Sequence, residues 1–279
     1  MKILPQIITS RTNSTIKWLA SLSDKKGREK SRSFIAEGEK LVLEAAAARL
    51  PVTHIAVARA KASRIIPLIE KAYADDVYSE LIVIVVEDDV FSKISTEMSP
   101  QGVICVIKYL DFFESRDIIY KEDFSFSENG RAIVLLSMRD PSNVGAVIRS
   151  AAAFGIKHII MSSDCADVYN PKVVRSAMGA LFKVRITKVS SMESFARAWH
   201  ECGRRLFAAE LSDGAIPLSR ISLLKSDAFI IGNEGHGIPA DVSALCDASV
   251  YIPISSDTES LNASVAASIL MWEQSGAEL

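Results

Sequence analysis

The chain has 279 residues, of which 49% are hydrophobic and 24% are charged. This length suits one or two domains, and these proportions are those of a globular rather than a disordered protein. The formal charge of −2 at pH 7 excludes a generally basic surface, so any nucleic-acid contact must depend on a local patch. No apolar run reaches transmembrane length and the N-terminus has no signal-peptide core, which predicts a soluble, cytoplasmic protein with no membrane contact.

The cysteines show no pattern of a metal site or a disulfide framework. All four are scattered, without a Cys-x-x-Cys pair or a neighbouring His cluster: Cys105, Cys165, Cys202 and Cys246. This spacing favours reduced thiols in a cytosolic protein and predicts no bound metal.

Residues 10 to 33 form a locally basic segment, in which Asp24 and Glu29 are the only acidic residues. Apolar spacing predicts a short helix over residues 13–22. A solvated charged face explains such a cluster more often than phosphate contact does, and both interpretations stay open. If the segment binds RNA, the candidate side chains are Arg11, Lys17, Lys25, Lys26 and Arg28.

Strands and helices then alternate in two blocks, separated by an acidic stretch at 109–130 that has no periodicity and is interpreted as a linker. The pattern predicts α/β architecture, with a mostly parallel sheet covered by helices on both faces in the second block. The expected domains are residues 1–108 and 131–279. In the first, strands are expected near 34–36, 54–58, 81–86 and 102–108, with helices at 39–48, 62–74 and 91–95. In the second, strands are expected at 132–136, 157–161, 182–186, 206–209, 228–231 and 250–254, with helices from 143 and at 172–180, 192–202 and 261–273.

The stretch from Asp140 to Gly155 follows a buried strand and carries the first polar loop of the second block. A small-residue helix is expected to begin near Asn143 and to end with a left-handed cap at Gly155. Asn143 and Arg149 are its polar exceptions, and their six-residue separation places them about 600° apart around the helix, on different faces. A capping role for Asn143 and a solvated one for Arg149 explain them equally well.

Two more loops follow apolar strands. Residues 230–239 place three glycines around Asn233, Glu234 and His236, where glycine allows positive φ and close approach of the backbone to a ligand. Their order does not match the dinucleotide fingerprint or the P-loop, and His236 alone is a weak candidate for a general base. In the third loop, residues 252–267, Ser260 is the expected helix cap. Such loops converge at one edge of an open α/β sheet, which predicts a cofactor or nucleotide site there.

The three loops resemble the ordered motifs of the SpoU (TrmH-type) RNA ribose 2′-O-methyltransferases. The matching residues are Asp140-Pro-Ser-Asn-Val-Gly…Arg149, Gly232-Asn-Glu-Gly-His-Gly and Ile252-Pro-Ile…Ser260-Leu-Asn-Ala-Ser264. Residues 10–108 resemble the L30e-like substrate-binding domain that often precedes this catalytic domain. That likeness is carried by Thr9-Ser-Arg-Thr-Asn13, Ile16-Lys17 and Phe34-Ile-Ala-Glu-Gly-Glu-Lys40.

The resemblance implies a C-terminal SPOUT domain with a trefoil knot, which dimerises with a second copy and holds S-adenosylmethionine in the knot. The implied activity is methyl transfer to a ribose 2′-hydroxyl. The added N-terminal domain with its basic residues favours large-subunit ribosomal RNA as the substrate. Transfer RNA as substrate, or a non-catalytic RNA-binding or assembly protein of the same fold, are the alternatives. Ala177 stands where the family often has Ser, which bears on substrate contacts.

The resemblance also assigns residues to roles. The implied catalytic residues are Arg149, Asn143, Glu234, Ser260 and Asn262. Arg149 acts either as the base or, because guanidinium groups stay protonated, by steering a phosphate and stabilising the developing alkoxide. The implied cofactor-binding residues are Gly232, Asn233, Gly235, Ile252, Pro253, Ile254, Ser260 and Leu261. Arg175 joins the candidate RNA-binding residues.

Overall fold

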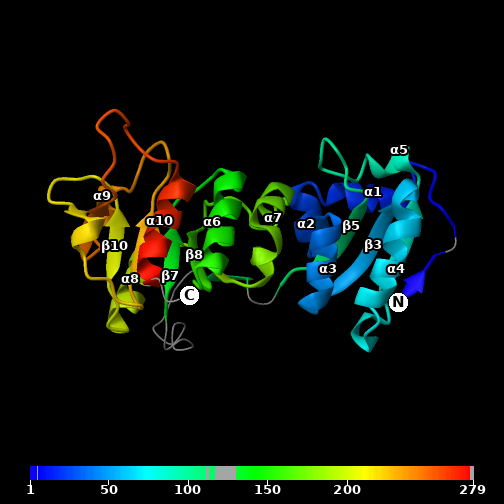
Figure 1. Ribbon diagram of the computed structural model, residues 1–279, viewed down its shortest axis with the longest axis horizontal. Coiled ribbons are helices and arrows are strands. Elements are labelled where there is room, and N and C mark those ends of the chain that lie inside the picture. Colours follow the sequence, from blue (N-terminus) through cyan, green and yellow to red (C-terminus); the bar gives the residue numbers. More distant parts are fainter. Residues whose placement is uncertain (5, 111–112, 117–129, 277–279) are drawn as a thin grey trace. The chain divides into compact units, whose positions relative to one another are not determined.

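The computed structural model describes residues 1–4, 6–110, 113–116 and 130–276, so most of the predicted linker lies outside the described residues. The chain divides into two compact units (Figure 1). Unit 1 comprises Met1–Leu110 together with Asp167–Phe182, and unit 2 comprises Asp111–Ala166 and Lys183–Leu279. The chain thus passes from unit 2 into unit 1 at residue 167 and returns at residue 183.

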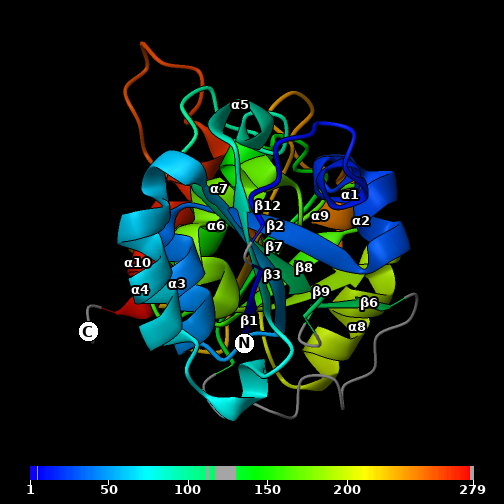
Figure 2. The same cartoon turned by 90° about the vertical axis from the view of Figure 1, so that its right-hand side faces the viewer.

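Unit 1 is built on a mixed five-stranded sheet in the order β1-β4-β3-β5-β2. Strand β5 runs antiparallel to β2 and β3, while β3, β4 and β1 are parallel. Helices α1 and α2 lie on one side of the sheet, and α3 and α4 lie on the other (Figure 2). The strands are β1 (Lys2–Ile3), β2 (Ser33–Glu37), β3 (Val52–Ala58), β4 (Ile82–Val86) and β5 (Val103–Lys108); the helices are α1 (Ser14–Ser21), α2 (Lys25–Ser31), α3 (Glu39–Ala47), α4 (Ala62–Ala72), α5 (Asp88–Phe91) and α7 (Pro171–Ala177).

The predicted helices at 13–22, 39–48 and 62–74 are confirmed as α1, α3 and α4. Helix α2 was not predicted, because its one buried residue is Arg28 and a helix without buried apolar residues has no hydrophobic period. The helix expected at 91–95 is wrong in position, since α5 ends at Phe91.

Unit 2 is built on an eight-stranded sheet in the order β11-β13-β10-β12-β7-β8-β9-β6. All of its strand pairs are parallel, which confirms the predicted parallel sheet. Strand β6 comes from within the predicted linker. The strands are β6 (Phe113–Arg116), β7 (Ala132–Leu135), β8 (His158–Ser162), β9 (Arg185–Val189), β10 (Leu206–Ala209), β11 (Ile216–Pro217), β12 (Ala228–Ile231) and β13 (Ala248–Tyr251); the helices are α6 (Pro141–Ala153), α8 (Met192–Glu201), α9 (Ala240–Ser243) and α10 (Ala263–Ser275).

Two predicted strands of unit 2 are displaced. The strand expected at 182–186 is β9, at 185–189, because Met178–Phe182 forms a 3₁₀ turn. The strand expected at 250–254 is β13, which ends at Tyr251, so Ile252–Ile254 lies in a loop. The trefoil knot implied by the resemblance stays a prediction.

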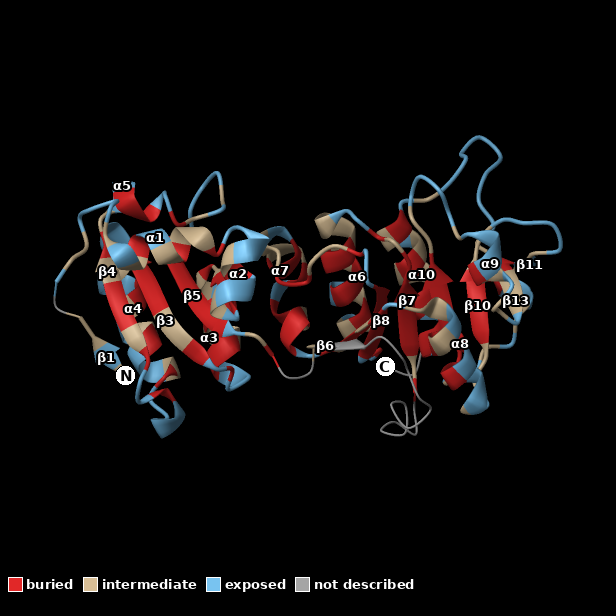
Figure 3. Cartoon of the chain, turned by 180° about the vertical axis from the view of Figure 1, so that it is seen from behind, coloured by how far each residue is buried: buried red, intermediate tan, exposed pale blue. Residues whose placement is uncertain are grey.

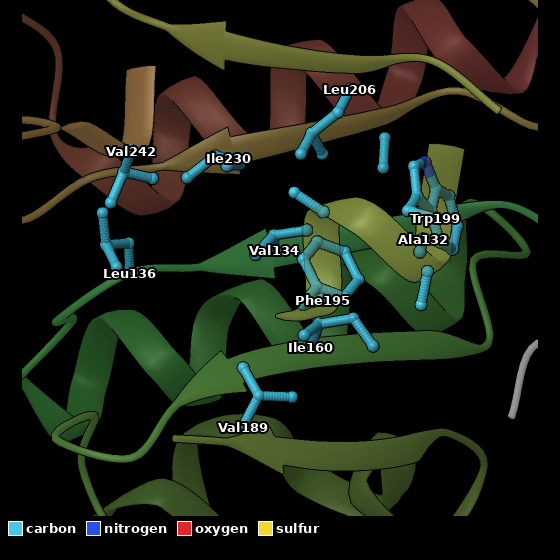
Figure 4. Packing of buried hydrophobic residues seen from close by; sticks show 13 residues of the cluster. Ala132, Val134, Leu136, Ile160, Val189, Phe195, Trp199, Leu206, Ile230 and Val242 are labelled. Carbon is cyan, nitrogen blue, oxygen red and sulfur yellow. The ribbon is translucent and has the colours of Figure 1, made fainter. Parts of the chain in front are cut away.

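The core of unit 2 joins helix α8 to the middle of the sheet (Figure 4). Phe195 and Trp199 project from α8 onto Val134, Ile160 and Ile230, and all five side chains are fully buried. Burial of one such side chain contributes about 1.5–3 kcal/mol, so this packing fixes the strands whose ends carry the polar loops. The central strands of both sheets are buried along most of their length, whereas β1, β11 and β13 are mostly not buried (Figure 3).

Membrane spans and metal clusters are both absent from the described residues. No described helix combines the length and the apolar character of a membrane span. No group of three or more metal-ligating side chains occurs in the described part of the chain.

Candidate functional site

Three polar loops lie at the same edge of the eight-stranded sheet. Parallel strands all end at one edge, and β7, β12 and β13 end at Leu135, Ile231 and Tyr251. Strand β10 lies between β12 and β13, with Ala209 in register with Ile231 and Val250. The loops at 232–237 and 252–262 therefore flank the end of β10, and the loop at 136–140 follows on the other side of β12.

The glycine loop after β12 closes tightly on itself. The Gly237 amide donates to the carbonyl of Asn233 at 2.8 Å, and Gly237 has φ +65°. A Cβ at Gly232 would lie 2.5 Å from the Gly237 carbonyl oxygen, so only glycine fits there. The Asn233 side chain accepts from the Gly235 amide and donates to the Ser137 carbonyl, both at 2.8 Å. The turn is thereby fixed to the loop after β7.

Helix α6 begins at Pro141, and its cap is Asp140 rather than Asn143. The Asp140 carboxylate accepts from the Ser142 amide at 2.6 Å and from the Asn143 amide at 3.2 Å. The capping interpretation of Asn143 is therefore wrong. Gly155, with φ +72°, follows the helix in the left-handed conformation that was predicted.

The side chain of Asn143 links the other two loops. Its Nδ2 donates to Glu234 Oε1, and its Oδ1 accepts from Asn262 Nδ2 at 3.1 Å. Asn262, and not Ser260, caps helix α10: its Oδ1 accepts from the amides of Ser264 at 2.9 Å and Val265 at 3.3 Å. The expected cap at Ser260 is wrong, and Ser260 is an exposed loop residue. One amide thus joins all three predicted motifs.

Arg149 is exposed on α6, and no described residue forms a hydrogen bond or ion pair with it. Helix α6 packs along α10 (Figure 1), where Ser150 Oγ lies 2.8 Å from Ser268 Oγ and the Phe154 and Trp272 rings meet edge to face at 5.9 Å. No hydrogen bond or ion pair among the described residues links the Arg149 guanidinium to the glycine loop.

The candidate RNA-binding residues separate by exposure. Arg28 is 2% exposed and donates to the carbonyls of Leu22 and Ser23 and to the Asp167 carboxylate. Its assignment as an RNA contact is wrong, because its donors are used inside unit 1. Arg175 pairs with Glu97. The exposed members of the set are Arg11, Lys17, Lys25 and Lys26.

Two further polar groups at this edge were not found from the sequence. Glu210 follows β10 and accepts from the hydroxyls of Ser243 at 2.6 Å and Ser249 at 2.7 Å. Arg139 directly precedes the capping Asp140 and pairs with Asp164. Their positions in the sequence could have indicated them. Each follows an expected strand of the same parallel sheet, and polar loop residues gather at that edge.

A family model described as the SpoU rRNA Methylase family matches residues 130–272, and one for an MRM3-like substrate binding domain matches residues 13–105. The chain belongs to the SpoU rRNA methylase family. The first match covers all three loops, which confirms the resemblance found in the sequence motifs.

Relatives in this SpoU family share nearly the whole length of the chain. A Bacillus subtilis protein, the 23S rRNA (guanosine(2553)-2′-O)-methyltransferase RlmP, is 29% identical over 96% of this chain and 99% of its own. An AdoMet-bound rRNA methyltransferase from Sinorhizobium meliloti superposes with a TM-score of 0.84 at 28% identity, covering 99% of both chains. The SpoU methyltransferase AviRb from Streptomyces viridochromogenes, in complex with AdoMet, gives 0.76 at 25% identity over 95% of this chain and 98% of its own.

Proposed function

We propose that this SpoU-family chain transfers a methyl group from S-adenosylmethionine to a ribose 2′-hydroxyl of large-subunit ribosomal RNA, in the cytoplasm. The observation that carries the proposal is the Asn143 amide, which joins Glu234 and Asn262 and so assembles three loops at one sheet edge. Whole-length relatives named as rRNA methyltransferases support this reaction and substrate.

The loops flanking β10 have the chemistry that S-adenosylmethionine requires. Gly235 is exposed and carries no side chain, so the backbone of this turn is accessible to a ligand, and Ile254, 41% exposed, offers apolar surface at the same edge. We assign the cofactor to backbone groups of residues 232–235 and 252–254 and to Leu261. When bound, it supplies a methyl group on a positively charged sulfur.

The transfer forms an oxygen–carbon bond, breaks the sulfur–carbon bond to leave a neutral thioether, and passes the hydroxyl proton to water, so the protein must chiefly orient the 2′-hydroxyl. Asn143 and Asn262 hold the mouth of the site in place, with the Glu234 carboxylate beside them. We assign to Arg149 the steering of an RNA phosphate and the stabilisation of the developing alkoxide, because a guanidinium fork binds a phosphate in two places.

We further propose that two copies pair through α6 and α10. Two large apolar side chains are exposed one heptad apart on α10, Val265 at 46% and Trp272 at 47%. Arg149 is exposed on the adjoining helix. In such a dimer Arg149 of one copy serves the site of the other, which is consistent with its lack of a described partner within the chain.

The reaction is tested with tritium-labelled S-adenosylmethionine and ribosomal RNA from cells without the gene, followed by mapping of the 2′-O-methyl position. We expect Arg149→Ala and Arg149→Lys to reduce methyl transfer by at least about a hundredfold, as for removal of one oriented charge at a reacting centre. Cofactor affinity, measured by calorimetry, should be unchanged. Full turnover in Arg149→Lys would contradict the assigned role. Labelling of transfer RNA but not of ribosomal RNA would identify transfer RNA as the substrate instead.

The RNA path across unit 1 is tested at α2. Lys25 and Lys26 are exposed on it, and Lys25 has only a loose pair with Glu29 at 3.7 Å. We expect Lys25→Glu with Lys26→Glu to weaken RNA binding and to lower its salt dependence by about one unit of slope for each phosphate that the variant no longer binds. Lys71→Glu is the matched control, because Lys71 is exposed on α4, on the other side of the sheet (Figure 2). Equal effects of the two changes would remove α2 from the RNA path.

A further inference from the structure

A second guanidinium, that of Arg139, lies on the loop directly before α6, the helix that carries Asn143, and the proposed reaction does not use it. Arg139 is 73% exposed, and its Nη2 lies 3.5 Å from Asp164 Oδ2. That distance is at the outer limit of a hydrogen bond, and a guanidinium has five N–H donors, so most of its capacity is directed to solvent.

Asp164 is a firmly held partner for this guanidinium. Its Oδ1 accepts from Ser162 Oγ at 2.6 Å, and the same hydroxyl oxygen accepts from the Ser137 amide at 2.8 Å. Burial alone would raise the pKa of Asp164, but hydrogen bonds from Ser162, Ser137 and Arg139 outweigh it and lower the pKa. The carboxylate thus stays charged and is tied to the ends of β7 and β8.

The loop itself is held at both ends against the glycine turn. Ser137, with φ +53°, is a non-glycine residue in the left-handed region, a conformation that persists only where the surroundings impose it. Its carbonyl accepts from Asn233 Nδ2, and at the other end Asn143 donates to Glu234. Arg139 lies between these two attachments, so its backbone is fixed relative to the predicted cofactor loop.

The sheet order sets the side of the site on which Arg139 acts. Strand β7 lies between β12, to whose loop the cofactor is assigned above, and β8, whose loop carries Asp164. Arg139 therefore extends from the β7 loop toward β8, away from the cofactor side. Because the proposed site places the target ribose beside the cofactor, the β8 side is left for a neighbouring nucleotide. An exposed ion pair of this kind contributes about 0–1 kcal/mol, so fold stability does not account for the arrangement.

We infer that Arg139 binds an RNA backbone phosphate adjacent to the methylated ribose, and that Asp164 positions its guanidinium. The inference rests on the proposed function, since it names a contact of that site with its substrate. Arginine suits the role because its planar fork matches phosphate geometry, and phosphate contacts of this kind fix the register of a nucleic acid.

The test uses the full-length protein, labelled S-adenosylmethionine and ribosomal RNA from cells that lack the gene. For Arg139→Ala we expect the KM for RNA to rise about tenfold with kcat nearly unchanged, and the salt dependence of RNA binding to fall by about one unit of slope. Arg139→Lys should leave the salt slope unchanged but lower the affinity for RNA by less than Arg139→Ala does, because lysine keeps the charge but lacks the planar fork. Affinity for S-adenosylmethionine should not change.

Arg197→Ala is the matched control, because Arg197 is 67% exposed and pairs with Glu193 at 2.9 Å on α8; it should change none of these values. Asp164→Asn should raise the KM for RNA by a smaller factor, and should add nothing in the Arg139→Ala background, as expected for a residue that acts through Arg139.

The two proposals fail differently. An unchanged KM and salt slope in Arg139→Ala, with an active wild-type protein, would overturn the inference. A loss of S-adenosylmethionine affinity equal to the loss of RNA affinity would overturn it too, in favour of a structural role. A wild-type protein that transfers no methyl group to RNA would instead overturn the proposed function.

Discussion

Arg28 shows how a single side chain can contradict its sequence context. It stands among exposed lysines, yet it is 2% exposed and bonds to two carbonyls of the α1–α2 connection. Its Nε and Nη2 both reach Asp167 Oδ2, at 3.3 and 2.7 Å. A buried cation needs such partners, because isolated burial of a charge is costly. Arg28 therefore anchors α2, while the lysines of the same helix face solvent.

Replacement of Arg28 should destabilise unit 1 far more than replacement of a surface arginine. Arg28→Met leaves Asp167 and two carbonyls without their donor, and breaking a buried pair costs about 3–5 kcal/mol. We take the lower end, because the Asp167 side chain is 21% exposed. Arg64→Met removes an ion pair with Glu39 in which the Arg64 side chain is 59% exposed and the Glu39 side chain 34% exposed. It should lower the free energy of unfolding by less than about 1 kcal/mol. Urea unfolding measures the loss of stability in each variant, and hydrogen exchange shows whether α2 and β2 lose protection. Equal losses of stability in the two variants would contradict the anchoring role.

At the scale of helices and strands, apolar periodicity located the elements and polar chemistry decided their ends. Helix α6 was expected from its small apolar residues, but both Asp140 and Asn143 are capping residue types, and sequence alone does not choose between them. The choice matters, because the cap at Asp140 leaves the side-chain amide of Asn143 available to Glu234 and Asn262. Likewise, Ser260 and Asn262 are both capping residue types, and the N-cap of α10 is Asn262 rather than the expected Ser260. Convergence of the loops was predictable from the parallel sheet, whereas the amide that joins them was not.

Helix α10 also carries the surface on which dimer formation is proposed. Trp272 is 47% exposed and rests against Phe154 of α6, so a charge at this position would oppose burial against a second copy. We expect Trp272→Glu to convert a dimer to a monomer in light scattering and to abolish methyl transfer, because Arg149 would be separated from its partner site. Met98→Glu, at a fully exposed apolar residue of unit 1, should leave the mass unchanged. A Trp272→Glu protein that remains dimeric would place the interface elsewhere.

At the scale of the whole molecule, the order of motifs does not reveal which residues fold together. Residues 167–182 lie between the first two methyltransferase motifs in sequence, yet they pack within unit 1. Tyr169 stacks on Tyr109 at 4.1 Å, its hydroxyl accepts from the Leu110 amide at 2.9 Å, and its ring contacts Phe34 at 4.6 Å. No local pattern encodes such contacts, because they join positions that are 59 or more residues apart.

A fragment ending at residue 110 should therefore fail to reach the native fold of unit 1. This fragment lacks residues 167–182. Its Arg28 is therefore buried without the Asp167 carboxylate, and its Phe34, fully buried in the intact chain, is exposed. We expect residues 1–110 alone to show broad, non-cooperative unfolding and little amide protection in α2 and β2. A synthetic peptide of residues 165–184 should restore protection, and the same peptide with Asp167→Asn and Tyr169→Ala should not. Cooperative unfolding of the fragment alone, with α2 protected, would show that unit 1 is complete without the inserted segment.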